Sequence, residues 1–398
     1  MNPKNHIEQL IHNLRPSGVP YKTLGEVCDG IYAGGTPLTS HPEYYDGDIP
    51  WLRSGEIDFN IITSTSRKIT KLGFESSSAR MVPAKSVLMA MTGATVAKVA
   101  INEIKLTANQ SVCALVPSSD LHYRFMYYYL ALKYNTLRDT AQGALTSFNI
   151  GLIKQIKIPL PPLPIQEEIV QILDTFTELI TNIDTEIKEQ QKIFTKLLNS
   201  FYDTNTQRVP IAALGKIIRG RRFIRTDIVE QGIPCIHYGD IYTKYSICVN
   251  KALTYLIGDI TKRMRYAQSG DVVYVGAGEN DEDIGMAIAW LGKEPVAVHD
   301  ACYILSKHEQ NAKYLAYVSR ANNFHHQLRM SVAMGKICSI PPDGLGRVKI
   351  PLPSLAEQNT IVKQLETIEA LITNLKAERD LRQQQYEYYR ENLINLLK

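Results

Sequence analysis

The sequence predicts a mixed α/β protein in which two similar globular domains are each followed by a long helix. Three observations lead to this prediction. A proline-rich phrase occurs twice, an apolar pattern typical of a coiled coil follows each copy, and short β-prone runs fill the segments before each copy. A chain of 398 residues is also longer than one ordinary core requires, which favours two domains.

The duplicated phrase reads KIPLPPLPIQEEI at residues 157–169 and KIPLPSLAEQNTI at residues 349–361, an offset of 192 residues. Between Lys157–Glu186 and Lys349–Glu378, 16 of 30 aligned positions are identical. The tetrapeptide LITN occurs in both segments. A constant offset over this length indicates an internal duplication and predicts a pseudo-two-fold arrangement.

Each copy of the phrase opens a long helical pattern. No glycine or proline occurs between Pro164 and Pro210, and the apolar residues there alternate in steps of three and four. This spacing predicts a coiled-coil seam on a helix of roughly 36 residues, on the order of 54 Å long. We expect the two helices to pack antiparallel on each other. The predicted seam residues are Ile169, Leu173, Phe176, Ile180, Ile183 and Ile187 in the first helix and Ile361, Leu365, Ile368, Ile372 and Leu375 in the second.

The globular segments repeat more faintly. IPWLRSGEI (Ile49–Ile57) parallels IPCIHYGDI (Ile233–Ile241), and β-prone runs such as SVLMAM and DVVYVGAG lie between glycine, proline and asparagine turns. Each globule should therefore contain a twisted sheet with helices. We expect the first domain at residues 1–155 and its helix at 156–203, then the second domain at 204–345 and its helix at 346–398.

Composition is that of an ordinary soluble globular protein, with 44% apolar and 21% charged residues and a net charge of +4. The six cysteines are scattered without a CxxC pair, which favours buried reduced thiols over a zinc site or disulfides. The N-terminal residues lack the apolar core of a signal peptide, and no run approaches membrane-spanning length. We expect a cytoplasmic protein that does not enter a membrane.

Two fragments resemble nucleotide-binding loops. VVYVGAG (Val272–Gly278) combines a strand with GxG, but acidic residues and a second β-like run follow it instead of the helix that such a loop needs. SVAMGKI lacks both the upstream glycine of a P-loop and the following serine or threonine. We therefore expect a hairpin at the first fragment, and no catalytic residue, metal site or cofactor in this chain.

Basic and aromatic residues in the globules favour a nucleic-acid surface. RGRRFIR (Arg219–Arg225) places four arginines within seven residues. Individually such residues are more often solvated charges or packed aromatics, but as a set they favour DNA. Two diverged globules joined by long helices fit a bivalent reader with one half-site per globule. The predicted DNA-binding residues are Arg53, Arg80 and Lys98 in the first globule and Arg221, Arg222, His237, Tyr238, Lys244, Tyr245 and Lys336 in the second.

Three segments resemble a known family. GIYAGGTPLTSHPEYYDGDIPWLRSGEI (Gly30–Ile57) resembles the start of a target-recognition domain of the specificity subunit of Type I restriction–modification systems. Ile158–Asp174 resembles the entry to that family's spacer helix, and Gln383–Leu397 resembles its C-terminal end. The resemblance covers essentially the whole chain. It implies two target-recognition domains that read a split sequence in double-stranded DNA across an unread gap.

The resemblance also implies partners. Two modification subunits would dock near the helices and restriction subunits would join them, supplying S-adenosylmethionine, ATP and Mg for adenine-N6 methylation with base flipping and for cleavage. Two other interpretations compete with this one. The chain could be a coiled-coil scaffold whose globules bind proteins and have no DNA role, or a self-sufficient methyltransferase.

Overall fold

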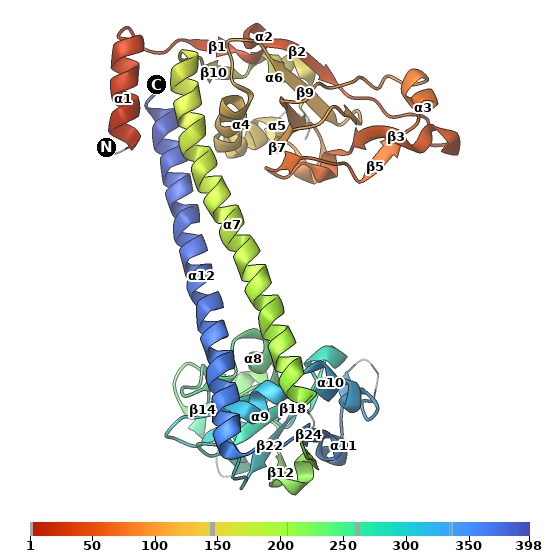
Figure 1. Cartoon of the computed structure of the whole chain (residues 1–398), viewed down its shortest axis with the longest axis vertical. Coiled ribbons are helices and arrows are strands. Elements are labelled where there is room, and N and C mark those ends of the chain that lie inside the picture. The colour runs from red at the N-terminus through yellow and green to blue at the C-terminus, as the bar shows by residue number, and fades with distance from the viewer. Residues whose placement is uncertain (1–2, 144–147, 205, 259–262, 334, 336) are drawn as a thin grey trace. The chain divides into compact units, whose positions relative to one another are not determined.

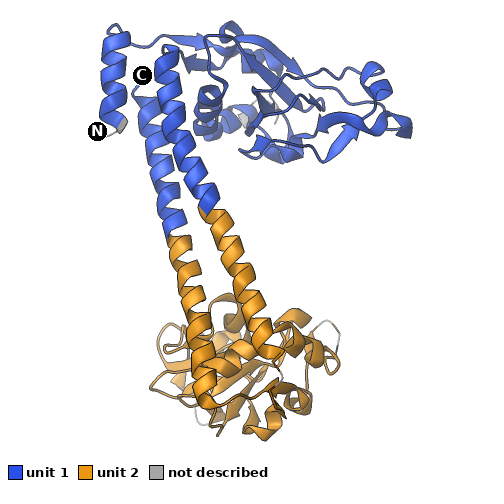
Figure 2. Ribbon diagram, viewed as in Figure 1, with its two compact units in different colours: residues 1–182, 378–398 blue, residues 183–377 orange. Residues whose placement is uncertain are grey.

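The structure is a computed structural model that describes residues 3–143, 148–204, 206–258, 263–333, 335 and 337–398 (Figure 1). The chain forms two compact units, drawn in different colours in Figure 2. Unit 1 comprises Met1–Asn182 and Glu378–Lys398, and unit 2 comprises Ile183–Ala377. Each unit contains one globular domain and a part of each of the two long helices.

The domain of unit 1 is built on a five-stranded sheet of order β2-β9-β6-β7-β4. Its neighbours are antiparallel except for β4, which runs parallel to β7. The strands are β2 (Cys28–Ala33), β9 (Val112–Pro117), β6 (Ser86–Ala90), β7 (Val99–Asn102) and β4 (Ile61–Ile62). A second sheet has the order β5-β3-β8, in which β3 and β8 are parallel, with β5 (Arg67–Ile69), β3 (Tyr45–Leu52) and β8 (Thr107–Ala108).

The domain of unit 2 repeats this plan. Its first sheet has the order β12-β22-β18-β20-β15, again with only the edge pair, β15 and β20, parallel. The strands are β12 (Lys216–Arg219), β22 (Cys302–Ser306), β18 (Val272–Val275), β20 (Ala287–Trp290) and β15 (Cys248–Val249). The second sheet has the order β13-β16-β14-β21-β17, with β14 and β21 parallel. Its strands are β13 (Ile228–Val229), β16 (Thr254–Leu256), β14 (Ile233–Ile236), β21 (Val296–Val298) and β17 (Tyr266–Ala267), and a small pair joins β19 (Ala277–Gly278) to β23 (Cys338–Ser339).

Helices flank the sheets and connect them. In unit 1 they are α1 (Pro3–Leu14), α2 (Leu24–Val27), α3 (Lys71–Glu75), α4 (Tyr123–Leu132), α5 (Tyr134–Gly143) and α6 (Ile150–Gln155). In unit 2 they are α8 (Tyr238–Thr243), α9 (Ala312–Val318), α10 (Asn322–Arg329) and α11 (Pro342–Arg347). The shared strand orders and the shared positions of the parallel pairs confirm the prediction of two similar mixed α/β domains produced by an internal repeat.

The long helices are α7 (Leu163–Tyr202, 40 residues) and α12 (Leu355–Asn395, 41 residues), somewhat longer than the sequence predicted. The first begins before Pro164 because a proline in the first turn of a helix gives up only an N–H that has no helical partner. In unit 1 the first part of α7 and the last part of α12 run side by side in opposite directions (Figure 1), and the Phe176 and Tyr389 rings stack at 5.3 Å between centroids. All eleven predicted seam residues are buried or half-buried.

Each unit has its own apolar core, to which the long helices contribute. In unit 1, Ile169 and Leu173 of α7 pack with the strands, with α4 and with Ile7 of the N-terminal helix α1. In unit 2, Leu365 of α12 and Tyr202 at the end of α7 join the core in the same way. The long helices are therefore part of the folding units and not merely linkers between them.

The duplicated phrase begins with a strand that closes its domain. Lys157–Pro159 (β10) pairs antiparallel with Tyr21–Thr23 (β1), and Lys349–Pro351 (β24) pairs antiparallel with Arg208–Pro210 (β11). Within each unit the first and last strands of the domain thus lie beside each other. The prolines that follow interrupt the strand, since proline fixes φ and lacks the N–H of a ladder, and the chain then enters the long helix.

A buried glutamine from each phrase fastens the long helix to its domain. Gln166 and Gln358 are both 0% exposed. Gln166 accepts a hydrogen bond from the backbone N–H of His122, just before α4, at 2.8 Å, and donates to the carbonyl oxygens of Asp120 and Pro161. Gln358 accepts from the N–H of Asn311, just before α9, at 3.0 Å, and donates to the carbonyl oxygen of Pro353 at 2.9 Å. The same amide therefore performs the same task in both units.

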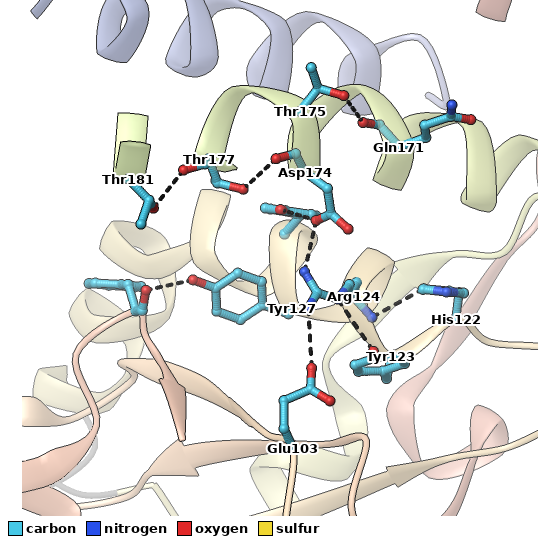
Figure 3. Close-up of polar contacts among 12 residues, drawn as sticks. Glu103, His122, Tyr123, Arg124, Tyr127, Gln171, Asp174, Thr175, Thr177 and Thr181 are labelled. Carbon is cyan, nitrogen blue, oxygen red and sulfur yellow. Dashed lines mark hydrogen bonds and ion pairs between the residues drawn. The ribbon is translucent and has the colours of Figure 1, made fainter. Parts of the chain in front are cut away.

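Each long helix also carries a carboxylate, eight residues after the glutamine, that forms an ion pair with its domain. In unit 1, Arg124 bridges Asp174 of α7 at 3.0 Å and Glu103 at 3.1 Å (Figure 3), and the Tyr128 hydroxyl donates to Asp174. Burial is the main cause that raises the pKa of Tyr128, and its bond to the Asp174 carboxylate raises it further. We call the glutamine and the ion pair of each unit its joint.

The corresponding joint of unit 2 has the same layout with different residues. Lys313 of α9 pairs with Glu366 of α12 at 2.5 Å, and the Tyr317 hydroxyl donates to Glu369 at 2.6 Å. The basic residue and the tyrosine are four residues apart in each joint. They therefore project from the same face of α4 in unit 1 and from the same face of α9 in unit 2. Both joints thus pair a basic residue of the domain with a carboxylate of the long helix, although the residue types differ.

Replacing Gln166 or Gln358 by leucine should destabilise the full-length chain markedly. Leucine keeps the approximate volume but leaves a buried N–H and a buried carbonyl without partners, each at a cost of about 1–3 kcal/mol. Urea unfolding of the full chain measures the change. The matched control is Gln191→Leu, because Gln191 lies exposed on the same helix α7 and should shift stability by less than about 0.5 kcal/mol. Equal shifts for Gln166→Leu and the control would contradict the role of the joint.

Candidate nucleic-acid interface

Two parallel strands end side by side in each domain, and the chain presents polar residues just after them. In unit 1, Arg53 follows β3 and Asn109 follows β8, and the Asn109 N–H donates to the Leu52 carbonyl at 2.9 Å. In unit 2, His237 follows β14 and His299 follows β21, and the His299 N–H donates to the Ile236 carbonyl at 3.1 Å. The carboxyl ends of neighbouring parallel strands are a common place for binding residues in α/β sheets.

A loop that begins with glycine lies against these strand ends. A Cβ on Gly34 would lie 2.1 Å from the carbonyl oxygen of Ala108, and a Cβ on Gly220 would lie 2.1 Å from that of His299. No side chain fits at such distances, so glycine is required where the loop leaves β2 or β12. This close approach brings residues 34–38 of unit 1 and 220–224 of unit 2 next to the residues that follow the parallel strands.

In unit 2 these segments line a cavity of about 750 Å³. Its aromatic wall consists of Phe223, His237, Tyr238 and His299. The distance between ring centroids is 4.7 Å for Phe223 and His299 and 4.8 Å for His237 and His299. Arginines from the RGRRFIR run also line it, namely Arg219, Arg222 and Arg225. Rings for stacking beside guanidinium groups for phosphate form a combination suited to a nucleotide.

The two histidines of this cavity are held in defined orientations. His299 accepts a hydrogen bond from the Ala301 N–H at Nδ1, so its Nε2 carries the proton toward the Phe223 carbonyl oxygen at 3.2 Å. His237 accepts from the Gly239 N–H at Nδ1 and caps α8. Burial lowers the pKa of both imidazoles, and His237 and Arg222 lower the pKa of His299 further while Asp300 opposes them. Both rings are therefore mainly neutral near pH 7.

The basic residues predicted for unit 1 lie in different settings. Arg53 is exposed, and its side chain extends from the N-terminal end of a short 3-10 turn. Arg80 is also exposed, with its guanidinium carbon 5.7 Å from the centre of the Tyr32 ring. Lys98 is half-buried and pairs with Asp58 at 2.5 Å. Arg53 and Arg80 thus have freely accessible charge, whereas the charge of Lys98 is balanced within the domain.

The DNA-binding residues predicted for unit 2 also divide into accessible residues and residues with a partner inside the domain. Arg222, His237 and Tyr238 line the cavity, and Arg221 is exposed in the same loop. Lys244 pairs with the buried carboxylate of Asp240 at 2.8 Å, and the half-buried Tyr245 accepts a hydrogen bond from the Leu253 N–H at its hydroxyl. Lys336 lies outside the described residues.

Sequence reasoning missed Phe223 and His299 as partners in this site. Phe223 stands inside the arginine run, and that position was the available signal. His299 is separated from His237 by 62 positions in the sequence, and only the pairing of β14 with β21 brings the two rings together. The available signal for His299 was its place in the segment VHDAC, which occupies the same position in the second domain as ANQSV does in the first.

The strand that precedes the GxG sequence and two of the buried cysteines have structural positions. Val272–Val275 (β18) pairs antiparallel with β20, so the expected hairpin is confirmed, and β19 and a 3-10 turn at Asp281–Asp283 lie between its two strands. Burial raises the pKa of the Cys113 thiol to about 12 and raises that of Cys302 as well, which keeps both protonated at neutral pH. Within the described ranges, no group of three His, Cys, Asp or Glu residues is placed to hold a metal ion, and no helix is long and apolar enough to cross a membrane.

Comparisons with known proteins point to one family. The model of the Type I restriction modification DNA specificity domain matches residues 16–193 and again 204–381. The chain is 25% identical over 412 residues to a putative type I restriction enzyme specificity subunit of Haemophilus influenzae, covering 99% of both proteins. It is 26% identical over 211 residues to the EcoR124I/EcoR124II specificity subunit of Escherichia coli, covering 50% of this chain and 52% of that protein.

Solved structures have the same fold. A chain from a structural study of complex assembly and conformational transition of the type I R-M system aligns with a TM-score of 0.63 at 17% identity, over 95% of this chain and 98% of that one. The S subunit of a Type-I restriction-modification system from M. genitalium aligns with a TM-score of 0.53 at 13% identity, over 94% and 96% of the two chains. The chain therefore belongs to the family of Type I restriction–modification specificity subunits and carries two recognition domains.

Proposed function

We propose that this chain selects the DNA target of a Type I restriction–modification complex by reading two short half-sites separated by an unread gap. The observation that carries the proposal is the pair of recognition domains, which share the strand order of their first sheet and a parallel strand pair in their second sheet but carry different side chains at the ends of that pair. Two copies of one fold with different polar residues fit two different short sequences better than they fit a single symmetric partner. Each domain then reads one half-site.

We assign domain boundaries and DNA-binding residues accordingly. Recognition domains occupy residues 1–155 and 204–345, and spacer helices occupy 156–203 and 346–398. The exposed or cavity-lining residues are the leading DNA contacts, namely Arg53, Arg80, Arg221, Arg222, His237 and Tyr238. Lys98, Lys244 and Tyr245 would have to exchange an internal partner to reach DNA. Lys336 stays a prediction from sequence.

We assign DNA methylation and DNA cleavage to partner subunits. In this proposal two modification subunits methylate adenine at N6 with S-adenosylmethionine after base flipping, and restriction subunits use ATP and Mg to translocate and cleave. The family membership supports this division of labour. So do the protonated thiols of Cys113 and Cys302 and the antiparallel pairing of β18 with β20, which give these segments structural roles.

The complex of this chain with its modification subunits should bind duplex DNA in a salt-sensitive manner. A protein that contacts six or more phosphates loses roughly 10³-fold or more in affinity between about 50 and 200 mM salt, because counterions are released on binding. Selection from a randomised duplex library, followed by titration at several salt concentrations, measures both the motif and the salt dependence. Salt-insensitive binding, or selection of no motif, would instead support a protein-binding scaffold.

Helix length should set the length of the gap. Residues 177–188 of α7 read TELI, TNID and TEIK, a loose four-residue repeat. Insertion of four residues after Ile180 adds about 6 Å of helix, which is close to two base pairs at about 3.4 Å each. We expect the methylated motif of the insertion variant to keep both half-sites and to have a longer gap. The control replaces residues 181–184 by a second copy of residues 177–180, which keeps the length of α7 and should leave the gap unchanged. An unaltered gap in the α7 variant would contradict this proposal.

A further inference from the structure

The two domains present corresponding side chains at one place, and backbone hydrogen bonds establish the correspondence. The Gly34 N–H donates to Val112 and the Gly220 N–H donates to Cys302, while the bonds from Asn109 to Leu52 and from His299 to Ile236 align the neighbouring strand ends. From these bonds four pairs of equivalent residues follow. They are Thr36 with Arg222, Leu38 with Ile224, Arg53 with His237, and Gln110 with Asp300. We call the first members the first reading cluster and the second members the second reading cluster.

Each cluster keeps an exposed aliphatic side chain at the same position. Leu38 is 62% exposed and Ile224 is 52% exposed. Single exposed apolar residues are common on protein surfaces. Here, however, the two recur at equivalent loop positions while the polar residues around them have changed. A retained aliphatic contact beside variable polar groups suits a groove of DNA, where apolar side chains contact thymine methyl groups or sugars.

In each cluster one of the polar members has a side-chain contact that limits its direction. In the first cluster the Thr36 hydroxyl donates to the Gln110 side-chain oxygen, which joins the glycine loop to the end of β8. In the second cluster Asp300 lies 3.3 Å from His299 Nδ1 and 3.9 Å from Arg219, next to Arg222 in the cavity. Backbone hydrogen bonds from Gly35 to Ala108 and from Arg221 to Val298 hold the loop of each cluster against the neighbouring strand end.

The hydrogen-bonding character of the clusters differs between the domains. Arg53 and the amide of Gln110 suit guanine and adenine respectively, because a guanidinium matches guanine O6 and N7 and an amide matches adenine N6 and N7. In the second cluster, Asp300 offers only acceptors and suits an amino group such as that of cytosine. His237 uses Nδ1 to cap α8, and among the described residues Nε2 has no hydrogen-bond partner, so that nitrogen is available to a base.

We infer that the two reading clusters are the base-reading sites of the two domains, with Arg53 and His237 as the paired residues that determine specificity. This inference rests on the proposed function, since it assigns a role within DNA recognition. It goes further by placing base discrimination at four equivalent positions per domain. Arg80 lies outside the clusters and acts on the phosphate backbone without regard to sequence, and Lys244 also lies outside them, with its charge balanced by Asp240.

Two variants test the inference in the complex with its modification subunits. Arg53→Gln removes an exposed guanidinium, and His237→Asn retains a side chain that can cap α8 while removing the imidazole. We expect Arg53→Gln to reduce discrimination at one base position of one half-site by at least tenfold, with the other half-site unchanged. His237→Asn should do the same in the opposite half-site only. Selection from a randomised duplex library, with melting temperatures to verify folding, provides the readout.

Arg80→Ala and Lys244→Ala are the controls, and we expect them to lower affinity equally for all sequences or to have no effect. The inference is overturned if Arg53→Gln and His237→Asn leave both half-sites unchanged, if either changes both half-sites, or if the controls alter base preference as strongly. A wild-type complex that selects no two-part motif would instead overturn the proposed function itself, so the two failures are distinguishable.

Discussion

The structure depends on a buried amide that fastens each recognition domain to its long helix. Gln166 and Gln358 have no access to water, and each satisfies the backbone just before a domain helix and the backbone of its own proline segment. A buried amide can be accommodated only if its donors and acceptors are matched, so its surroundings are restricted to one arrangement. The joint therefore fixes how the domain of each unit is attached to its helix, and the strand ends that carry the reading cluster belong to that same domain.

This constraint explains which parts of the duplicated chain stay alike. In both units the glutamine accepts from the N–H just before a domain helix and donates to a proline carbonyl of its own phrase, while its other donor bond goes to the Asp120 carbonyl in unit 1 and to the Gln310 side chain in unit 2. The charge relation beside it is kept although Arg124 with Asp174 is replaced by Lys313 with Glu366. The reading clusters have diverged instead, from Arg53 to His237 and from Gln110 to Asp300. Under the proposed function, attachment and recognition thus use separate residues, and one can change without disturbing the other.

Much of this architecture could be predicted from the sequence. The constant offset of the proline phrase revealed the repeat, and the three-four spacing revealed the long helices with their seam. The glutamine was visible as an identity at position ten of both phrases, but no sequence pattern shows which backbone groups it contacts. The N–H groups that donate to the two glutamines lie 44 and 47 residues away along the chain, beyond the reach of local reasoning.

The candidate site was less predictable, because it is assembled by strand pairing. His237 and Arg53 were identified from composition, yet His299 and Gln110 join them only through the register of β14 with β21 and of β3 with β8. Likewise, the ion pairs of Lys98 and Lys244 depend on carboxylates that only the fold brings close. Residue type alone cannot separate a charge that is available to DNA from one that is balanced internally.

We propose above all that this chain alone decides which two-part DNA sequence its complex modifies. Sequencing of N6-methylated adenines across the genome, in cells with and without this gene, tests that claim most directly. We predict one motif, made of two short half-sites with an unread gap, that is methylated only when the gene is present. Identical methylation in both cells, or loss of a motif without a gap, would contradict the account.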